Sequence, residues 1–164
     1  YSSARAWTLG TANASNTVYA AFSDAAGNEI FANDAIVHDS LPPATATALV
    51  WALGSITNST VLQTNWVRST SPDLANQKIQ FYADATCTTV SGALVDLASS
   101  TLATRTFTAG GDGVYAFKIQ SIDAAGLSST TTCSPATTVD LTAPTVAISS
   151  PAAGSSINSA NAAA

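Results

Sequence analysis

The chain has 164 residues, of which 46% are hydrophobic and only 9% are charged, and its formal net charge at pH 7 is -5. The hydrophobic share is large enough to bury a core, but the few basic residues are scattered, so no cationic patch is predicted for nucleic acid or an anionic membrane surface. No apolar run approaches the roughly 20 residues of a membrane span, and the many hydroxyl-bearing and β-branched residues favour strands and turns over helices.

One phrase occurs twice, as VYAAFSDAAGN at 18–28 and as VYAFKIQSIDAAGL at 114–127. Each copy is followed by an aspartate and a proline segment, DSLPP at 39–43 and DLTAP at 140–144. Both landmarks recur after about 100 residues, which is the size of an immunoglobulin-like sandwich. The spacing therefore predicts tandem domains of related build.

The proline segments set the predicted domain limits, because proline fixes φ and cannot donate to a strand ladder. Residues 1–41 are expected to be the last strands of one domain. Residues 42–141 are expected to form a complete domain, and residues 142–164 the first strand of a third. The fold class predicted is an all-β tandem sandwich with partial domains at both ends.

Within the complete domain, short stretches alternate between apolar and polar residues, with turn signals between them. Leu62, Thr64 and Trp66 share one predicted face, and Ser71-Pro72-Asp73 predicts a turn after that strand. About seven strands are expected, as in an immunoglobulin-like sandwich, and no helix is predicted. The expected strands are 46–53, 59–69, 78–84, 92–97, 102–108, 114–123 and 129–140.

The end pieces are predicted to expose apolar faces and unpaired strand edges, since residues 1–41 supply only three final strands. Two explanations remain open. Either the sequence is a fragment of a longer chain, or the tail of one copy adds a strand to the head of the next. The second explanation places Val146 and Ile148 against the strand that contains Ile36 in another copy.

The middle of the chain resembles a fibronectin type III domain. The similarity rests on Trp66 in the second strand and on Tyr115-x-Phe117-x-Ile119 followed by Asp-Ala-Ala-Gly. It implies that Trp66, Tyr115, Phe117 and Ile119 are core residues and that the Tyr115 hydroxyl closes a tyrosine corner. The outer pieces resemble immunoglobulin-like repeats of large exported bacterial surface proteins, which implies an extracellular or bacterial cell-surface location.

Cys87 and Cys133 are the two cysteines of the chain. Two free buried thiols remain an alternative, but a disulfide is the favoured interpretation if the protein is exported. Neither cysteine belongs to a CxxC motif, and the lone His38 cannot complete a zinc set. His38 also lacks a GxSxG motif or a comparable nucleophile, so we expect no enzyme activity and no cofactor other than calcium.

The sequence also contains candidate calcium ligands. Aspartate and asparagine side chains at interdomain hinges can supply the six to eight oxygen ligands that Ca²⁺ takes. The competing interpretation is that these side chains cap their own turns. The candidate residues are Asp24, Asn28, Asp39, Asp123 and Asp140.

Binding of sugars by stacking would require exposed tryptophan rings. Trp7 and Trp66 lie in alternating stretches and are predicted to be core residues. Trp51 is predicted to be the exposed or hinge-packing aromatic, because it lies near a domain edge.

The predicted function is a structural or adhesive segment of a bacterial surface or secreted repeat protein, such as a stalk or a fibre. The alternatives are a carbohydrate- or cell-surface-binding module and a spacer in a secreted hydrolase. The expected partners are other repeats, neighbouring copies, or a cell-surface glycan or protein. Nucleic acid and membrane spans are not expected.

Overall fold

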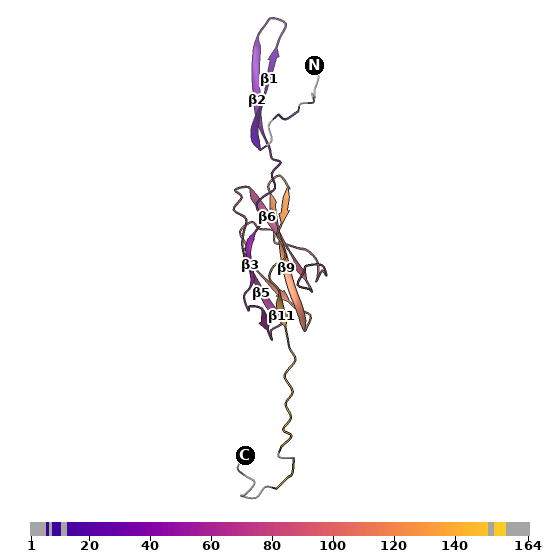
Figure 1. Ribbon diagram of the computed structural model, residues 1–164. Coiled ribbons are helices and arrows are strands. Elements are labelled where there is room, and N and C mark those ends of the chain that lie inside the picture. Colours follow the sequence, from indigo (N-terminus) through magenta and orange to yellow (C-terminus); the bar gives the residue numbers. More distant parts are fainter. Residues whose placement is uncertain (1–5, 7, 11–12, 151–152, 157–164) are drawn as a thin grey trace.

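The computed structural model describes residues 6, 8–10, 13–150 and 153–156. The described chain is elongated, with a hairpin at one end, a sandwich in the middle and an extended segment at the opposite end (Figure 1). Its strands are β1 (Ala14–Ser23), β2 (Glu29–His38), β3 (Thr47–Trp51), β4 (Ile56–Thr57), β5 (Val61–Val67), β6 (Leu74–Tyr82), β7 (Val95–Asp96), β8 (Thr104–Thr108), β9 (Gly113–Asp123), β10 (Ser128–Thr130) and β11 (Thr137–Val139). No helix occurs among these residues, so none has the length and apolar character needed to cross a membrane.

Two sheets build the sandwich. A 3-stranded sheet has the order β3-β5-β8, and a 6-stranded sheet has the order β4-β11-β9-β6-β7 with β10 paired to β9. In the large sheet, Ile79 lies opposite Ile119 and Phe81 lies opposite Phe117. Because side chains of directly opposite residues share a face, these pairs form one apolar layer.

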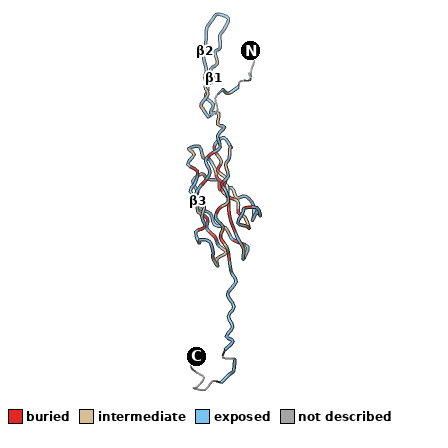
Figure 2. Tube along the Cα trace, viewed as in Figure 1, coloured by how far each residue is buried: buried red, intermediate tan, exposed pale blue. Residues whose placement is uncertain are grey.

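The apolar layer meets the inner face of the small sheet in an aromatic core. Trp51 lies edge-on to Phe117 with ring centroids 5.1 Å apart, and Phe81 stacks on Phe107 at 4.4 Å. Figure 2 shows that the buried residues concentrate in the sandwich and are absent from the described ends. The buried hydrophobic residues are Ala46, Trp51, Leu62, Trp66, Ile79, Phe81, Cys87, Leu97, Ala109, Tyr115, Ala116, Phe117, Ile119 and Val139.

The strand expected at 129–140 is in fact two short strands. β10 pairs with β9 near Ile122, whereas β11 pairs with the other end of β9 near Tyr115 and, in parallel, with β4. The chain between them carries Pro135, which cannot donate to a ladder and therefore interrupts pairing. The stretch expected at 92–97 forms a strand only over β7, and β4 was not predicted.

The end pieces differ from the three final strands and the one first strand that were expected. Among the described residues before the sandwich, only β1 and β2 form, paired from Ala14 opposite His38 to Ser23 opposite Glu29. No strand forms in 142–150 or 153–156. The physical reason is that a strand needs a partner, and the described chain offers none to this segment.

One face of the hairpin is apolar and open to solvent. Val18, Phe22, Ile30 and Ile36 lie on it, because Phe22 pairs with Ile30 and strand positions alternate by two. Phe22 is 51% exposed and Ile30 is 69% exposed. Such a face normally packs against a second sheet, so the hairpin has the character of half a sandwich.

Candidate functional site

The repeated Asp-Ala-Ala-Gly phrase folds into the same turn twice, once at the tip of the β1–β2 hairpin and once between β9 and β10. The amide of Gly27 donates to the Asp24 carbonyl at 3.1 Å, and the amide of Gly126 donates to the Asp123 carbonyl at 3.2 Å. Both glycines adopt a left-handed φ, 87° and 88°. This backbone explains the glycine, because a side chain at such a φ is strained.

The two turn aspartates differ in what their second carboxylate oxygen contacts. Asp24 Oδ2 accepts a hydrogen bond of 2.7 Å from Asn28 Nδ2, and this bond is the main cause that lowers the pKa of Asp24. Asp123 accepts from the amide of Leu127 at 2.8 Å through Oδ1. Its Oδ2 is buried and has no hydrogen-bond partner among the described residues. Leucine at position 127, where the first copy has asparagine, leaves this oxygen free.

The two linker aspartates also repeat a local structure. Asp39 Oδ1 accepts from the amide of Leu41 at 3.0 Å, and Asp140 Oδ1 accepts from the amide of Thr142 at 3.0 Å. Each is therefore a turn in which the aspartate caps the backbone two residues later. The surroundings of the two linkers nevertheless differ.

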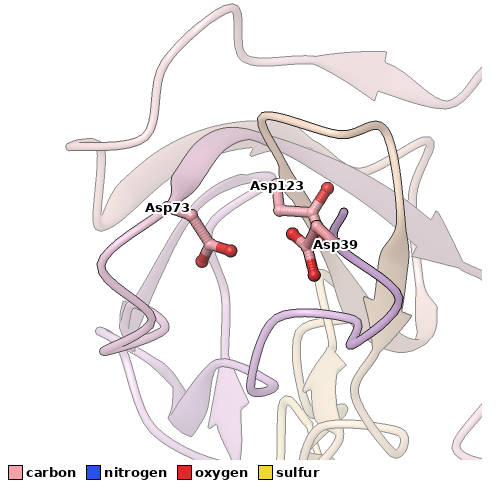
Figure 3. Close-up of side chains that lie close together, drawn as sticks. All are labelled: Asp39, Asp73 and Asp123. Atoms are coloured by element: carbon pink, nitrogen blue, oxygen red, sulfur yellow. The ribbon is translucent and has the colours of Figure 1, made fainter. Parts of the chain in front are cut away.

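Three carboxylates converge where the linker after β2 reaches the sandwich. Asp39, Asp73 and Asp123 offer ligand oxygens that all lie within 4.8 Å of one another. Figure 3 shows the Asp73 carboxylate turned toward those of Asp39 and Asp123. Asp73 comes from the turn before β6, and its carbonyl accepts a hydrogen bond of 3.0 Å from the amide of Ala124.

The other calcium candidates lie elsewhere. Asp24 and Asn28 bind one another at the distal tip of the hairpin, far from the linker (Figure 1). Asp140 lies at the opposite end of the sandwich, where Asp112 accepts from the amide of Leu141 and the hydroxyl of Thr142. The structure thus brings Asp39 and Asp123 together with Asp73, which the sequence did not single out as a ligand.

The expected disulfide is present. Cys87 and Cys133 are joined with an S–S distance of 2.00 Å. The bond links the loop between β6 and β7 to the segment between β10 and β11. This irregular segment leaves the ladder of the large sheet at Thr130 and rejoins it at Thr137. The disulfide fastens the segment in between.

The prediction that Trp51 is an exposed or hinge-packing aromatic was wrong. Trp51 is 7% exposed, its ring lies in the aromatic core, and its Nε1 donates to the Pro135 carbonyl at 3.1 Å. Trp66 is 4% exposed and donates to Gln77 Oε1 at 3.0 Å. Trp7 lies outside the described residues. His38 is the last residue of β2 and is half-buried.

The tyrosine corner implied by the resemblance is formed. The Tyr115 hydroxyl donates to the Gly111 carbonyl at 3.0 Å, four residues upstream. Phe117 and Ile119, the next inward residues of β9, are fully buried. This strand therefore runs through the centre of the core.

Comparisons with known proteins find likenesses among solved structures but none among sequences. No protein-family model matches the chain, and no curated protein sequence matches it. Among solved structures, the FN1-FN3 domains of chicken CNTN1 match with a TM-score of 0.50 and 13% sequence identity, over 78% of this chain and 43% of that one. The chain thus spans less than half of that protein.

This likeness, together with the two sheets and the tyrosine corner, defines the class of the protein. The chain has an immunoglobulin-like or fibronectin type III-like β-sandwich fold. The Cys87–Cys133 disulfide is typical of proteins in oxidising environments.

Proposed function

We propose that this chain is a load-bearing segment of an extracellular repeat protein, a stalk or fibre on a bacterial surface or in a secreted assembly, without catalytic activity. The observation that carries the proposal is the linear arrangement of its parts. The hairpin and the C-terminal segment leave the sandwich at opposite ends (Figure 1). A pull on the two ends of the chain therefore runs along the long axis of the sandwich.

The contact between β4 and β11 suits such a load. The two strands are parallel. β4 follows the first strand of the sandwich, β3, and β11 is its last strand, so each is linked by a short stretch of chain to one of the two ends that would be pulled. The amide of Thr138 donates to the Ser55 carbonyl at 2.9 Å, and the amide of Asp140 donates to the Thr57 carbonyl at 2.9 Å. A pull on both ends slides these strands past one another, so the bonds must break together rather than one by one.

The end pieces support the same function. The hairpin exposes an apolar face, and the C-terminal segment exposes Val146 at 93% and Ile148 at 82%. Exposed strand edges and apolar surfaces of this kind mark sites that pair with another sheet. We propose that adjoining repeats or neighbouring copies complete them, which extends the rod in the direction of the sandwich axis.

Single-molecule force measurement tests the load-bearing function. With the chain held at its two ends, we expect one unfolding event for the sandwich. Reduction of the disulfide should lengthen the chain released in this event by about 160 Å, because the residues between Cys87 and Cys133, 46 apart in sequence, are then freed at roughly 3.5 Å each.

Two proline variants locate the resistance. Thr138→Pro removes the donor to Ser55, so it should lower the unfolding force. Thr130→Pro is the matched control, since it places the same residue in β10, outside the β4–β11 contact. The proposal fails if the sandwich yields without measurable resistance, or if the two variants lower the force equally.

The carbohydrate-binding alternative has lost its main candidate. A stacking platform requires exposed aromatic rings beside a groove, and both described tryptophans are buried in the core. No observation on the described residues favours this alternative or the hydrolase spacer over the load-bearing function.

A further inference from the structure

We propose that Asp39, Asp73 and Asp123 form a Ca²⁺ site that ties the linker after β2 to the end of the sandwich. The three residues come from separate segments, the linker, the turn before β6 and the end of β9. Their ligand oxygens nevertheless lie within 4.8 Å of one another (Figure 3). Like charges held this close repel one another, and a cation between them removes the repulsion.

The buried oxygen of Asp123 is the second, independent observation. Asp123 is 2% exposed, and its Oδ2 makes no hydrogen bond within the described residues. A buried carboxylate oxygen without a partner is costly, so each such atom requires an explanation. The equivalent oxygen of Asp24, in the same turn, is satisfied by Asn28. The Oδ2 of Asp123 therefore lacks the partner that its twin has, and the Asp123 carboxylate belongs to the group of three.

No basic side chain supplies the missing charge. Lys78 with Asp96 is the one ion pair found within the described part of the chain. Asp39 Oδ1 and Asp123 Oδ1 accept backbone amides, which holds both side chains in place and leaves the second oxygen of each for another ligand. The site is thus fixed on two sides, with Asp73 exposed at its outer edge.

The chemistry of the donors selects the ion. All three are carboxylates, which suit hard cations such as Ca²⁺, Mg²⁺ and Mn²⁺. Mg²⁺ demands near-ideal octahedral geometry, whereas Ca²⁺ accepts irregular sets of six to eight oxygens. A site assembled from a linker, a turn and the end of a strand fits the second requirement better, with water completing the shell. Extracellular Ca²⁺ modules bind with dissociation constants of roughly 10⁻⁴ to 10⁻³ M, which is the range expected for this site.

The consequence is a joint whose stiffness depends on calcium. Asp39 belongs to the linker, while Asp73 and Asp123 belong to the sandwich, so the bound ion cross-links the two. The meaning of a stiff joint for a stalk rests on the proposed function. The binding itself does not, and it is measured independently of any mechanical role.

Calorimetric titration of the whole chain with CaCl₂ tests the proposal, with thermal unfolding as a second measurement. We expect one Ca²⁺ per chain and a higher unfolding temperature. Asp73→Asn should weaken binding by roughly tenfold or more. This variant should fold, because the exposed Asp73 carboxylate makes none of the side-chain hydrogen bonds seen in the described residues. Asp39→Asn should weaken binding similarly.

Asp140→Asn is the matched control. It removes the same charge from the same kind of linker turn, but at the opposite end of the sandwich, so Ca²⁺ binding should be unchanged. MgCl₂ at equal ionic strength should give weaker binding. The proposal is overturned if the unaltered chain binds no Ca²⁺ at about 5 mM, or if Asp140→Asn and Asp73→Asn weaken binding equally. Neither result would affect the force measurement, which tests the load-bearing function separately.

Discussion

Each buried tryptophan and tyrosine of this sandwich donates a hydrogen bond to a specific acceptor. Trp51 Nε1 donates to the Pro135 carbonyl, and Trp66 Nε1 donates to Gln77, whose own amide donates to the Leu102 carbonyl at 2.9 Å. These bonds connect the core to segments that form no regular ladder. Single side chains thus determine how the irregular parts of the sandwich are placed.

Tyr115→Phe measures the contribution of one such bond. The change removes the hydroxyl that donates to Gly111 while keeping the buried ring. We expect the free energy of unfolding to fall by about 1–2 kcal/mol, as measured by urea denaturation. Tyr82→Phe is the control, because its ring lies beneath Lys118 Nζ at 5.5 Å and its hydroxyl is not in the core. Equal losses of unfolding free energy in the two variants would contradict a stabilising role of the tyrosine corner.

Alternation identified which residues of β5 and β9 face inward, since Trp66, Tyr115 and Phe117 follow a period of two within long strands. Trp51 could not be placed in the same way. It ends a short strand, and its burial depends on Pro135, which lies 84 residues later. Asp73 was missed as a ligand for a similar reason, because only the fold brings its turn to Asp123.

Among the loops, the one that carries Cys87 is organised around a single carboxylate. Asp84 accepts hydrogen bonds from the amides of Thr86 at 2.7 Å and Thr88 at 3.1 Å, and from the amide of Thr89. Desolvation opposes ionisation of Asp84, but these bonds outweigh it and hold the pKa of Asp84 well below its usual value of 3.8. The loop is therefore built around the ionised form.

The lowered pKa predicts the direction of a pH effect. Because the pKa of Asp84 is lower in the folded than in the unfolded chain, its stabilisation is complete above pH 3.8 and is lost as the pH falls below that value. The unfolding temperature should therefore decline in acid. Asp84→Asn should be less stable at pH 6 and should lose less on acidification.

Comparison of the unaltered chain with Asp84→Asn separates the contribution of Asp84 from that of other carboxylates. Asp24 and Asp96, whose pKa values are also lowered by hydrogen bonds from Asn28 and Asn76 respectively, are unchanged in the variant. Identical acid sensitivity of both proteins would show that Asp84 does not hold the loop. Thermal unfolding monitored between pH 6 and pH 2 gives the answer.

Short strands marked the limit of what the sequence could predict for the fold. The long strands β5, β6 and β9 contain enough alternating residues to be recognised, although β6 begins at Leu74, earlier than expected. β4 and β7 have two residues each, so no periodicity exists to detect. Their existence depends on pairing with distant strands, a property of the assembled sheet rather than of the local sequence.

The described chain joins one complete core to a hairpin and an extended segment, neither of which contributes to the hydrophobic core. The repeated turn and the repeated linker aspartate show that the hairpin is built like the β9–β10 end of the sandwich. The domain limits at 41/42 and 141/142 remain predictions. The fold itself, an all-β sandwich, was predicted from alternation and from the fibronectin type III resemblance.

Completion by neighbouring copies has a direct test. If the tail of one copy pairs with the hairpin of the next, the mean mass in analytical ultracentrifugation should rise with concentration, because a head-to-tail contact does not close. Ile148→Asp should abolish the rise. Ala147→Asp, which adds the same charge on the opposite face of an extended strand, should not. A monomer at all concentrations would assign completion to adjoining repeats of the same chain.

The position of Asp39 has a consequence for where the sandwich can be excised from the chain. A sandwich cut at residue 42 would keep its core and its disulfide, but it would carry only two of the three clustered carboxylates. The third is contributed by whatever precedes it. Recombinant dissection therefore preserves the proposed Ca²⁺ site only when the excised sandwich keeps the few residues upstream of Pro42, including Asp39.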